Sequence, residues 1–205
     1  MKCAIVEFWQ RCHGAIHPED AAILEEHNHS LNLDHPPPAY LGDPRTAPIV
    51  LLNANGGYDR EMAKEEFATS EDVQRHLKRL HDPIAASFSA MSSYYLERNY
   101  ASLILEGKLT MVNALAYRSL KISEEPENEK IAKLLPSVEE HRRWLLDEVF
   151  PQALLGKRLV IAHRSRLWRL PKPLPEENVV QTLAPISPNL DAKTVLKIRD
   201  FLAKL

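Results

Sequence analysis

Four short apolar runs follow one another along the chain after residue 38, and each run is continuous rather than alternating with polar residues. They cover residues 47–53, 109–115, 158–163 and 178–183. Continuous apolar runs of this length are typical of strands buried on both faces, as in a parallel sheet. The pattern therefore predicts a central, mainly parallel four-stranded sheet.

The segments between these runs carry helical spacing and capping signals. Thr69 and Ser70 precede two acidic residues and a stretch that ends in basic ones, which suits the helix dipole. Ser137 and Glu140 have the spacing of a capping box for a long helix, and Asp191 can cap the last one. Because helices alternate with strands, the predicted architecture is an α/β fold, a three-layer α/β/α sandwich.

Residues 1–38 differ from the rest, since they hold five of the nine histidines and both cysteines and end in a proline-rich stretch. We expect a helical extension here, packed on the body of the protein through residues 21–24. Residues 39–205 are expected to form one domain, because a chain of 205 residues with 44% hydrophobic content suits a single core. The acidic stretch 123–130 is predicted to be a surface loop.

Charge and cysteine content limit the functional classes. The formal net charge of −2 gives no overall positive field, so binding to nucleic acid would need a local patch. Two cysteines are too few for a disulfide framework and indicate a reducing cytoplasm. No signal peptide or apolar run of about 18 residues is present, so no membrane partner is expected. The Cys and His spacings match no common zinc site, and we expect neither a metal nor another cofactor.

Polar residues follow the first apolar run, in the sequence "NANGG". In open parallel sheets ligands bind beyond the carboxyl ends of the strands. Asn53 and Asn55 offer donors and acceptors there, and Gly56 and Gly57 allow a ligand close to the backbone. The alternative is a tight strand-to-helix turn. The usual glycine-rich dinucleotide and P-loop motifs are absent from the sequence.

The later runs add further candidates. Asn113 lies inside the second run, where its amide either bonds to neighbouring backbone or faces a cleft. Residues 157–172 contain six Lys or Arg and no acid, with Trp168 among them, which suits phosphate contacts and stacking. A solvated basic helix face is the alternative. Ser187 follows the fourth run and could hold a phosphate, or belong to a plain capping turn.

Three motifs stand in order at predicted strand ends. "NANGG" contains Asn55, "MVN" ends in Asn113, and "PISPNL" contains Ser187 and Pro188. In this order they resemble the uracil-DNA glycosylase superfamily, in which a water-positioning Asp or Asn follows strand one, an Asn after strand two reads the base, and a His-Pro-Ser-Pro motif comes later. Pro185 stands at the position of the histidine in that motif.

The resemblance covers roughly residues 40–201 and implies the superfamily's α/β fold, with a nucleobase flipped out of DNA into a pocket. It implies that Asn55 orients a water and that Asn113 reads the base edge. The expected substrate-binding residues are Asn53, Gly56, Gly57, Asn113 and either Tyr58 or Phe67 as a stacking ring. The expected nucleic-acid contacts, with single-stranded or base-modified DNA, are Arg164, Arg166, Arg169 and Ser187.

Two departures bear on catalysis. Gly56 replaces the proline that follows the water-positioning residue, and Pro185 replaces the histidine that stabilises the departing base. An asparagine cannot act as a general base at neutral pH, so Asn55 could only orient a water. His163 could substitute for the histidine or be a core residue. The prediction is a nucleobase-binding protein with weak, mismatch-type or no N-glycosidic hydrolysis. The alternatives are a noncatalytic nucleotide- or partner-binding module, or an unrelated α/β enzyme acting on a small phosphorylated substrate.

Overall fold

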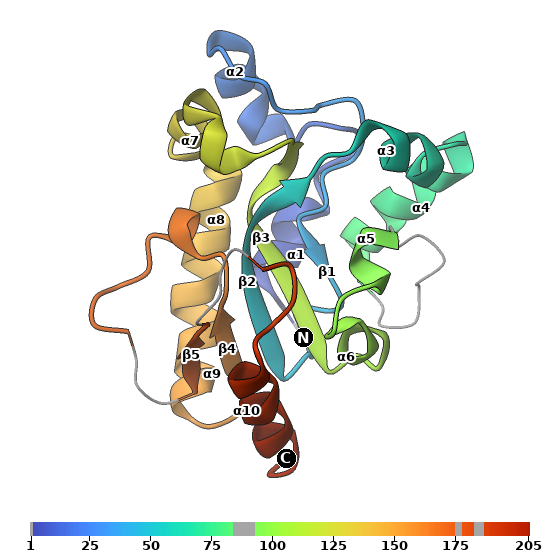
Figure 1. Cartoon of the computed structure of the whole chain (residues 1–205). Helices are drawn as coiled ribbons and strands as arrows, with labels where there is room; N and C mark the ends of the chain where they lie inside the picture. Colours follow the sequence, from blue (N-terminus) through green and yellow to red (C-terminus); the bar gives the residue numbers. More distant parts are fainter. Residues whose placement is uncertain (1, 84–92, 175–177, 183–186) are drawn as a thin grey trace.

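The computed structural model describes residues 2–83, 93–174, 178–182 and 187–205, and its centre is a five-stranded sheet (Figure 1). The strands are β1 (Tyr40–Leu41), β2 (Ile49–Gly57), β3 (Leu109–Ser119), β4 (Leu159–Ala162) and β5 (Val179–Gln181). Their order across the sheet is β1-β3-β2-β4-β5. Strands β3, β2, β4 and β5 are parallel to one another, whereas β1, at the edge, is antiparallel to β3.

The sequence located the parallel strands but not the whole sheet. Each predicted run overlaps one of β2 to β5, although Leu183, at the end of the fourth run, lies outside the described residues. The sheet has five strands and is mixed, so the predicted four-stranded sheet is wrong by one strand. Strand β1 has only two residues, with Tyr40 opposite Val112, and so short a run carries no periodic signal.

The sequence "NANGG" lies within β2 and not in a turn after it. Strand β2 continues to Gly57, and β3 continues to Ser119, each beyond its predicted end. The parallel pairing sets Asn53 beside Asn113, and the register shifts between Asn55 and Gly57. Because β3 offers backbone partners along this length, residues of low strand propensity are held in the extended conformation.

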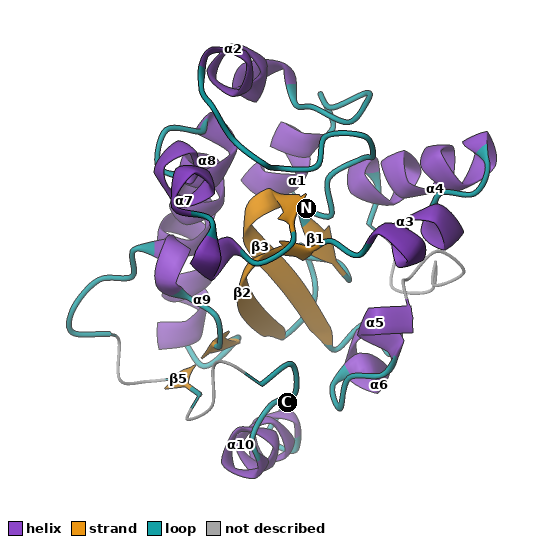
Figure 2. Ribbon diagram, turned by 45° about the horizontal axis from the view of Figure 1, so that its top comes forward, coloured by secondary structure: helices purple, strands orange, loops and turns teal. Residues whose placement is uncertain are grey.

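Alternate residues of the strands pack into two separate cores, one on each face of the sheet. Helices on the first face include α1 (Ala4–Trp9), α2 (Pro18–Glu26), α7 (Pro126–Ala132), α8 (Pro136–Trp144) and α9 (Phe150–Leu154). Helices on the second include α5 (Ser93–Leu96), α6 (Ala101–Leu105) and α10 (Ala192–Leu202). Figure 2 shows α8 and α9 on one side of the sheet and α6 and α10 on the other.

Two further helices, α3 (Arg60–Glu66) and α4 (Ser70–His81), follow β2. The predicted capping of α4 is confirmed, because Thr69 and Asp72 form a capping box. Asp191 caps α10 as predicted, with its carboxylate accepting from the Thr194 N–H at 2.9 Å. Short 3-10 turns cover Ile122–Glu124 and Arg166–Trp168.

The capping box predicted at Ser137 is wrong. Helix α8 begins at Pro136, and the cap comes from α2, where the buried Asp20 carboxylate accepts the Ser137 N–H at 3.0 Å. A carboxylate near the first turn also suits the helix dipole. The long helix predicted to follow is interrupted by a π-helical turn, Leu145–Val149, just before Pro151, which has no N–H to donate.

The N-terminal segment contains two helices where one was expected. Helix α1 is buried in the first core, whereas α2 contacts the body through Leu24 and Asp20, with Ala21 and Ala22 exposed. The stretch 123–130 is mostly turn and helix α7, so the loop prediction is wrong there. None of the described helices combines the length and apolar character needed to cross a bilayer.

Candidate functional site

The candidate site is the edge of the sheet where β2 and β4 end. Strand β2 lies at the centre of the sheet, and the chain leaving it returns to β3 on one side, whereas the chain leaving β4 goes to β5 on the other. In open α/β sheets the ligand position is at such a switch of direction, beyond the carboxyl ends of the strands. The Arg164 N–H donates to the Leu52 carbonyl at 3.1 Å, which joins the segment after β4 to β2.

Asn53 and Asn113, which the sequence placed at strand ends, are in contact. The Asn53 Nδ2 donates to the Asn113 Oδ1 at 2.8 Å, and the Asn113 Nδ2 donates to the Pro38 carbonyl at 2.5 Å. The Asn53 Nδ2 also reaches the Asn55 carbonyl at 3.0 Å. The fully buried Asn113 side chain therefore has protein partners for both its donor and its acceptor.

These two asparagines belong to a larger set of neutral hydrogen bonds, which we call the amide network: Asn53, Asn113, Trp9, His141 and Trp168. The Trp9 Nε1 donates to the His141 Nε2 at 2.6 Å, so the Nδ1 carries the proton and donates to the Asn113 carbonyl at 2.7 Å. Burial lowers the pKa of His141 to about 4, so the ring is neutral at neutral pH.

Trp168 belongs to the same network and not to a surface patch. Its side chain is buried, and its Nε1 donates to the Asn53 carbonyl at 2.7 Å. The interpretation of Trp168 as a stacking platform for nucleic acid is therefore wrong. The sequence favoured that interpretation because basic residues surround it, although its ring packs in the first core.

Asn55 faces Ser119 rather than Asn113. Its Nδ2 donates to the Ser119 Oγ at 2.7 Å and to the Gly56 carbonyl at 2.8 Å, and the residue is half-buried. A Cβ on Gly56 would lie 2.6 Å from the Cγ of Pro38, so packing against the proline-rich segment explains this glycine. Gly57 is exposed, with no atom near the position of a Cβ.

The two candidate stacking rings have different surroundings. The Phe67 ring is buried, and the His35 ring stacks on it with centroids 4.2 Å apart and planes at 9°. That face of Phe67 is therefore occupied by protein. Tyr58 is half-exposed at the end of β2, where its N–H donates to the Ser119 carbonyl at 3.0 Å.

Phe67 is part of a second buried group, which we call the ionic cluster: His35, Glu66, Phe67, His76 and Arg118. Arg118 on β3 forms a bidentate pair with Glu66 at the end of α3, with Nη1 and Nη2 at 2.9 and 3.2 Å from the two carboxylate oxygens. Both side chains are only 6% exposed. Paired in this geometry, the two charges satisfy one another away from water.

The ionic cluster is not fully satisfied. Arg79 donates to the His76 Nδ1 at 2.7 Å, so the His76 Nε2 carries a proton. That nitrogen lies 3.2 Å from a Glu66 oxygen but lacks hydrogen-bond geometry, and the Arg118 Nε also has no partner among the described residues. Burial, with the charges of Arg79 and Arg118, lowers the pKa of His76 to about 2.

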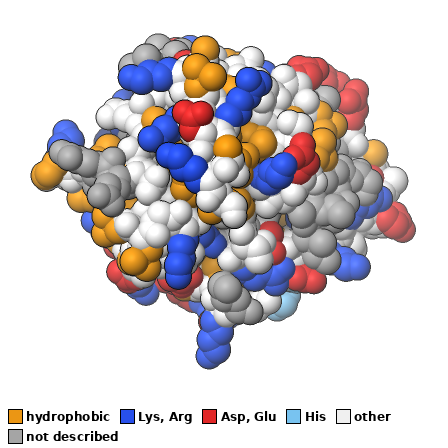
Figure 3. Space-filling view, turned by 90° about the horizontal axis from the view of Figure 1, so that it is seen from below, with side chains coloured by type: hydrophobic (Ala, Val, Ile, Leu, Met, Phe, Trp, Pro, Cys, Tyr) orange, Lys and Arg blue, Asp and Glu red, His pale blue; other side chains and the backbone are white. Residues whose placement is uncertain are grey.

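Part of the predicted basic patch is already engaged within the protein. Arg158 is buried and donates to the Arg45 carbonyl at 2.8 Å. Arg166 pairs with Glu129, and Arg169 pairs with Glu139 at 2.6 Å. Seen from below, at the amino ends of the parallel strands, Lys and Arg side chains lie among Asp and Glu side chains (Figure 3).

His163 links the ends of β4 and β5. Its Nε2 donates to the Ser187 carbonyl at 2.8 Å, and its Nδ1 accepts from the Thr182 hydroxyl at 2.9 Å. Burial lowers the pKa of His163. The Ser187 Oγ accepts from the Asn189 N–H at 3.1 Å, as in a local serine turn. Pro185, the histidine position of the resemblance, lies outside the described residues.

Sequence reasoning missed the ionic cluster. The one available signal was Arg118, a charged residue in the otherwise apolar run "NALAYRS", because a buried charge needs a partner. Tyr95 and Tyr100 are buried in the second core, and Tyr94 packs against it.

Within the described residues no three His, Cys, Asp or Glu side chains are grouped so that they could hold a metal ion. Cys3 and Cys12 are both buried free thiols. No protein-family model matches the sequence, and no curated protein or solved structure is detectably similar to it.

Proposed function

We propose that the protein is a uracil-DNA-glycosylase-like protein that binds a nucleobase, within DNA, at the carboxyl ends of β2 and β4. The observation that carries the proposal is the central position of β2, which puts Asn53 and Asn55 at the switch of chain direction. Helices against both faces of the sheet support a three-layer α/β/α arrangement for this fold.

Four half-buried or half-exposed residues at this edge would form the contact surface: Asn55, Tyr58, Arg164 and Ser187. The side-chain oxygen of Asn55, Oδ1, has no hydrogen-bond partner among the described residues. This oxygen can accept a hydrogen bond from a water or from an N–H of a base. Tyr58 supplies the stacking ring. The Asn113 amide is already paired, so its proposed role is to hold the Asn53 side chain in place by their hydrogen bond. Asn53, which is slightly exposed, would then contact the base.

Binding is better supported than hydrolysis. Asn55 cannot accept a proton at neutral pH, and His163 is neutral with both ring nitrogens engaged. We therefore propose slow or absent cleavage of the N-glycosidic bond, so that the noncatalytic form of the proposal is favoured. The two free buried thiols support a reducing compartment, and we propose the cytoplasm.

The DNA contact is proposed to be weak and dependent on salt. Arg166 and Arg169 already have glutamate partners, so a phosphate must compete with Glu129 and Glu139. Each phosphate contact that forms releases counterions, so the affinity should fall as salt rises. Alanine at Arg164, Arg166 and Arg169 together should lower both the affinity and its salt slope.

Fluorescence anisotropy with a uracil-containing single-stranded oligonucleotide tests the proposal. Asn55→Ala should weaken binding about tenfold, because the site loses a hydrogen-bonding group. Asn28→Ala is the matched control, since Asn28 is exposed and far along the chain from the strand ends. The proposal fails if uracil-containing and unmodified oligonucleotides bind equally and Asn55→Ala changes neither.

Excision by the variant Asn55→Asp separates the catalytic from the noncatalytic form. A carboxylate at this position supplies the base that asparagine lacks, so uracil release should rise above that of the natural protein if a glycosidic carbon lies nearby. Release that stays at background in both proteins, with binding intact, identifies a binding module.

A further inference from the structure

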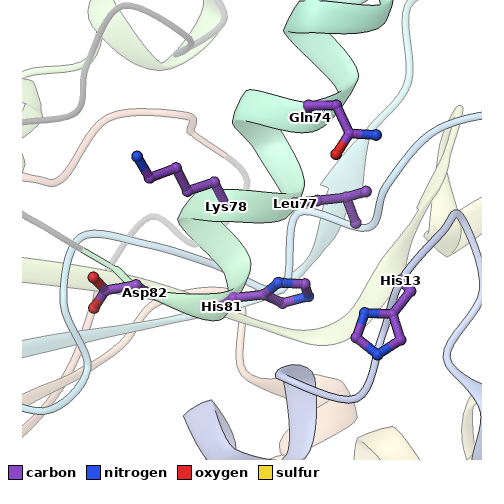
Figure 4. A pocket seen from close by; sticks show the side chains of 6 residues that line it. All are labelled: His13, Gln74, Leu77, Lys78, His81 and Asp82. Carbon is purple, nitrogen blue, oxygen red and sulfur yellow. The ribbon is translucent and has the colours of Figure 1, made fainter.

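A hollow separate from the sheet edge lies between α4 and the loop that follows α1 (Figure 4). Its volume is about 310 Å³, and it is lined by His13, Gln74, Leu77, Lys78, His81 and Asp82. This is the lower end of the range of small-molecule sites, about 300–1,000 Å³. The hollow is therefore large enough for a single small ring with one or two substituents.

The two walls of this hollow are tied to each other. The His81 Nε2 donates to the Cys12 carbonyl at 2.6 Å, and the Gln10 Nε2 donates to the His81 carbonyl at 3.0 Å. The rings of His13 and His81 meet edge to face, with centroids 5.4 Å apart. A hollow held in this way exists before any ligand arrives, so little ordering is needed on binding.

Lys78 gives the hollow its charge. Asp82 lies 3.2 Å from Arg45, a partner that it shares with Asp43 at 2.9 Å. Lys78 is exposed, and no ion pair or hydrogen bond of its side chain occurs among the described residues. Gln74, one turn earlier on the same face of α4, is also exposed without such a partner. The rim therefore presents a positive charge and an amide to an incoming group.

The floor is suited to a flat ring. Leu77 offers a buried apolar surface between Gln74 and His81. Because the Cys12 carbonyl can only accept, the His81 Nε2 carries the proton of that bond, and Nδ1 is the ring nitrogen left for a ligand. A ring that rests on Leu77 could donate an O–H or N–H to this nitrogen while its anionic group meets Lys78.

We propose that this hollow binds a small ring-shaped anion, whose carboxylate or phosphate contacts Lys78 and whose ring packs against Leu77, His13 and His81. The site is independent of the proposed nucleobase site, because none of its lining residues belongs to the carboxyl ends of β2 and β4. The shared chemistry is a flat ring with one anionic group, so aromatic carboxylates and aryl phosphates are both suitable.

Histidine-labelled full-length protein provides the test, through the NMR signals of His13 and His81. The probes are 4-hydroxybenzoate for a carboxylate, 4-hydroxyphenyl phosphate for a phosphate, and 4-hydroxybenzamide as the uncharged match of the first. We expect saturable shifts of both histidine signals with at least one anion, and binding about tenfold or more weaker with the amide. The anion that binds identifies the source of the charge.

Lys78→Met should weaken binding of that anion by a similar factor, whereas Lys133→Met should leave it unchanged. Lys133 is the matched control, because it is exposed and has no ion pair among the described residues. The proposal is overturned if neither anion gives saturable shifts, if the amide binds as tightly as the benzoate, or if Lys78→Met binds like the natural protein.

Discussion

The amide network and the ionic cluster are both attached to β3, through Asn113 and Arg118, and they solve the burial of polar groups in different ways. In the amide network neutral groups bond to one another and to backbone, from Trp9 through His141 and Asn113 to Asn53. In the ionic cluster Arg118 and Glu66 depend on each other, and the His76 Nε2 and the Arg118 Nε have no hydrogen-bond partner in the part of the chain that the structure describes. We therefore expect a neutral network to lose less stability than a buried ion pair when one member is removed.

The largest effect should come from breaking the ion pair. Glu66→Ala leaves the Arg118 charge buried, and removal of one partner from such a pair costs about 3–5 kcal/mol. Urea denaturation measures this cost. Glu66→Gln with Arg118→Met should be less destabilised than Glu66→Ala, because the Arg118 charge is removed together with its partner. A loss below about 1 kcal/mol for Glu66→Ala would place the cluster among weak surface pairs.

Acid should destabilise the protein through histidines that are buried in the neutral form. The folded pKa of His141, about 4, lies below the unfolded value of about 6.5, so between these values the unfolded chain binds more protons. Stability should therefore be full above about pH 6.5 and fall toward pH 4, by on the order of 3 kcal/mol from this residue.

Denaturation at pH 7 and pH 5 measures this loss, and His141→Gln should show a smaller difference than the natural protein. His76 shifts in the same direction, with a pKa of about 2, so its loss continues to lower pH. If His141→Gln and the natural protein lose the same unfolding free energy between pH 7 and pH 5, then protonation of His141 does not contribute to the acid sensitivity, which contradicts the prediction.

Removing one amide should cost less than removing the ion pair. Asn113→Ala leaves the Pro38 carbonyl without its donor and takes one of two acceptors from the Asn53 Nδ2. The expected loss is about 1–3 kcal/mol, the cost of buried polar groups left unpaired. A loss of stability as large as that of Glu66→Ala would show that the charge of the ionic cluster does not make it more sensitive to substitution than the amide network.

The smallest effect is expected at the surface ion pairs. Arg169 and Glu139 are each more than two-fifths exposed, and Arg166 is 70% exposed. Alanine at Arg166 and Arg169 should change stability by no more than about 1 kcal/mol, in contrast to the buried pair. Thermal denaturation at low and high salt checks this, and a loss above 2 kcal/mol at both would contradict it.

The pattern of apolar residues predicted those strands whose burial can be recognised from consecutive residues. The apolar runs located β2 to β5, because burial on both faces leaves its mark on consecutive residues. The same reasoning failed where the partner is distant in sequence. Strand β1 exists only because β3 is beside it, and the Ser137 N–H is capped by Asp20, 117 residues away.

The candidate site shows the same division. Asn53, Asn55 and Asn113 were selected because they follow or end apolar runs. The strands continue past them, but the sheet does bring Asn53 and Asn113 together. Their hydrogen-bond partners were not predictable, because the Pro38 carbonyl lies 75 residues from Asn113. The basic patch was overestimated for the same reason, since the acids that pair with Arg166 and Arg169 lie 37 and 30 residues away.

Helix α1 is synthesised long before the residues that bury it in the folded protein. Trp9 leaves the ribosome 132 residues before its partner His141, which at about 5–20 residues per second is a delay of roughly 7–26 s. Until α8 is made, the apolar face of α1, with Ile5, Val6 and Phe8, lacks the helix that packs against it in the folded protein. Burial of α1 is therefore a late event in the synthesis of this chain, and its apolar side chains stay accessible to other molecules until then.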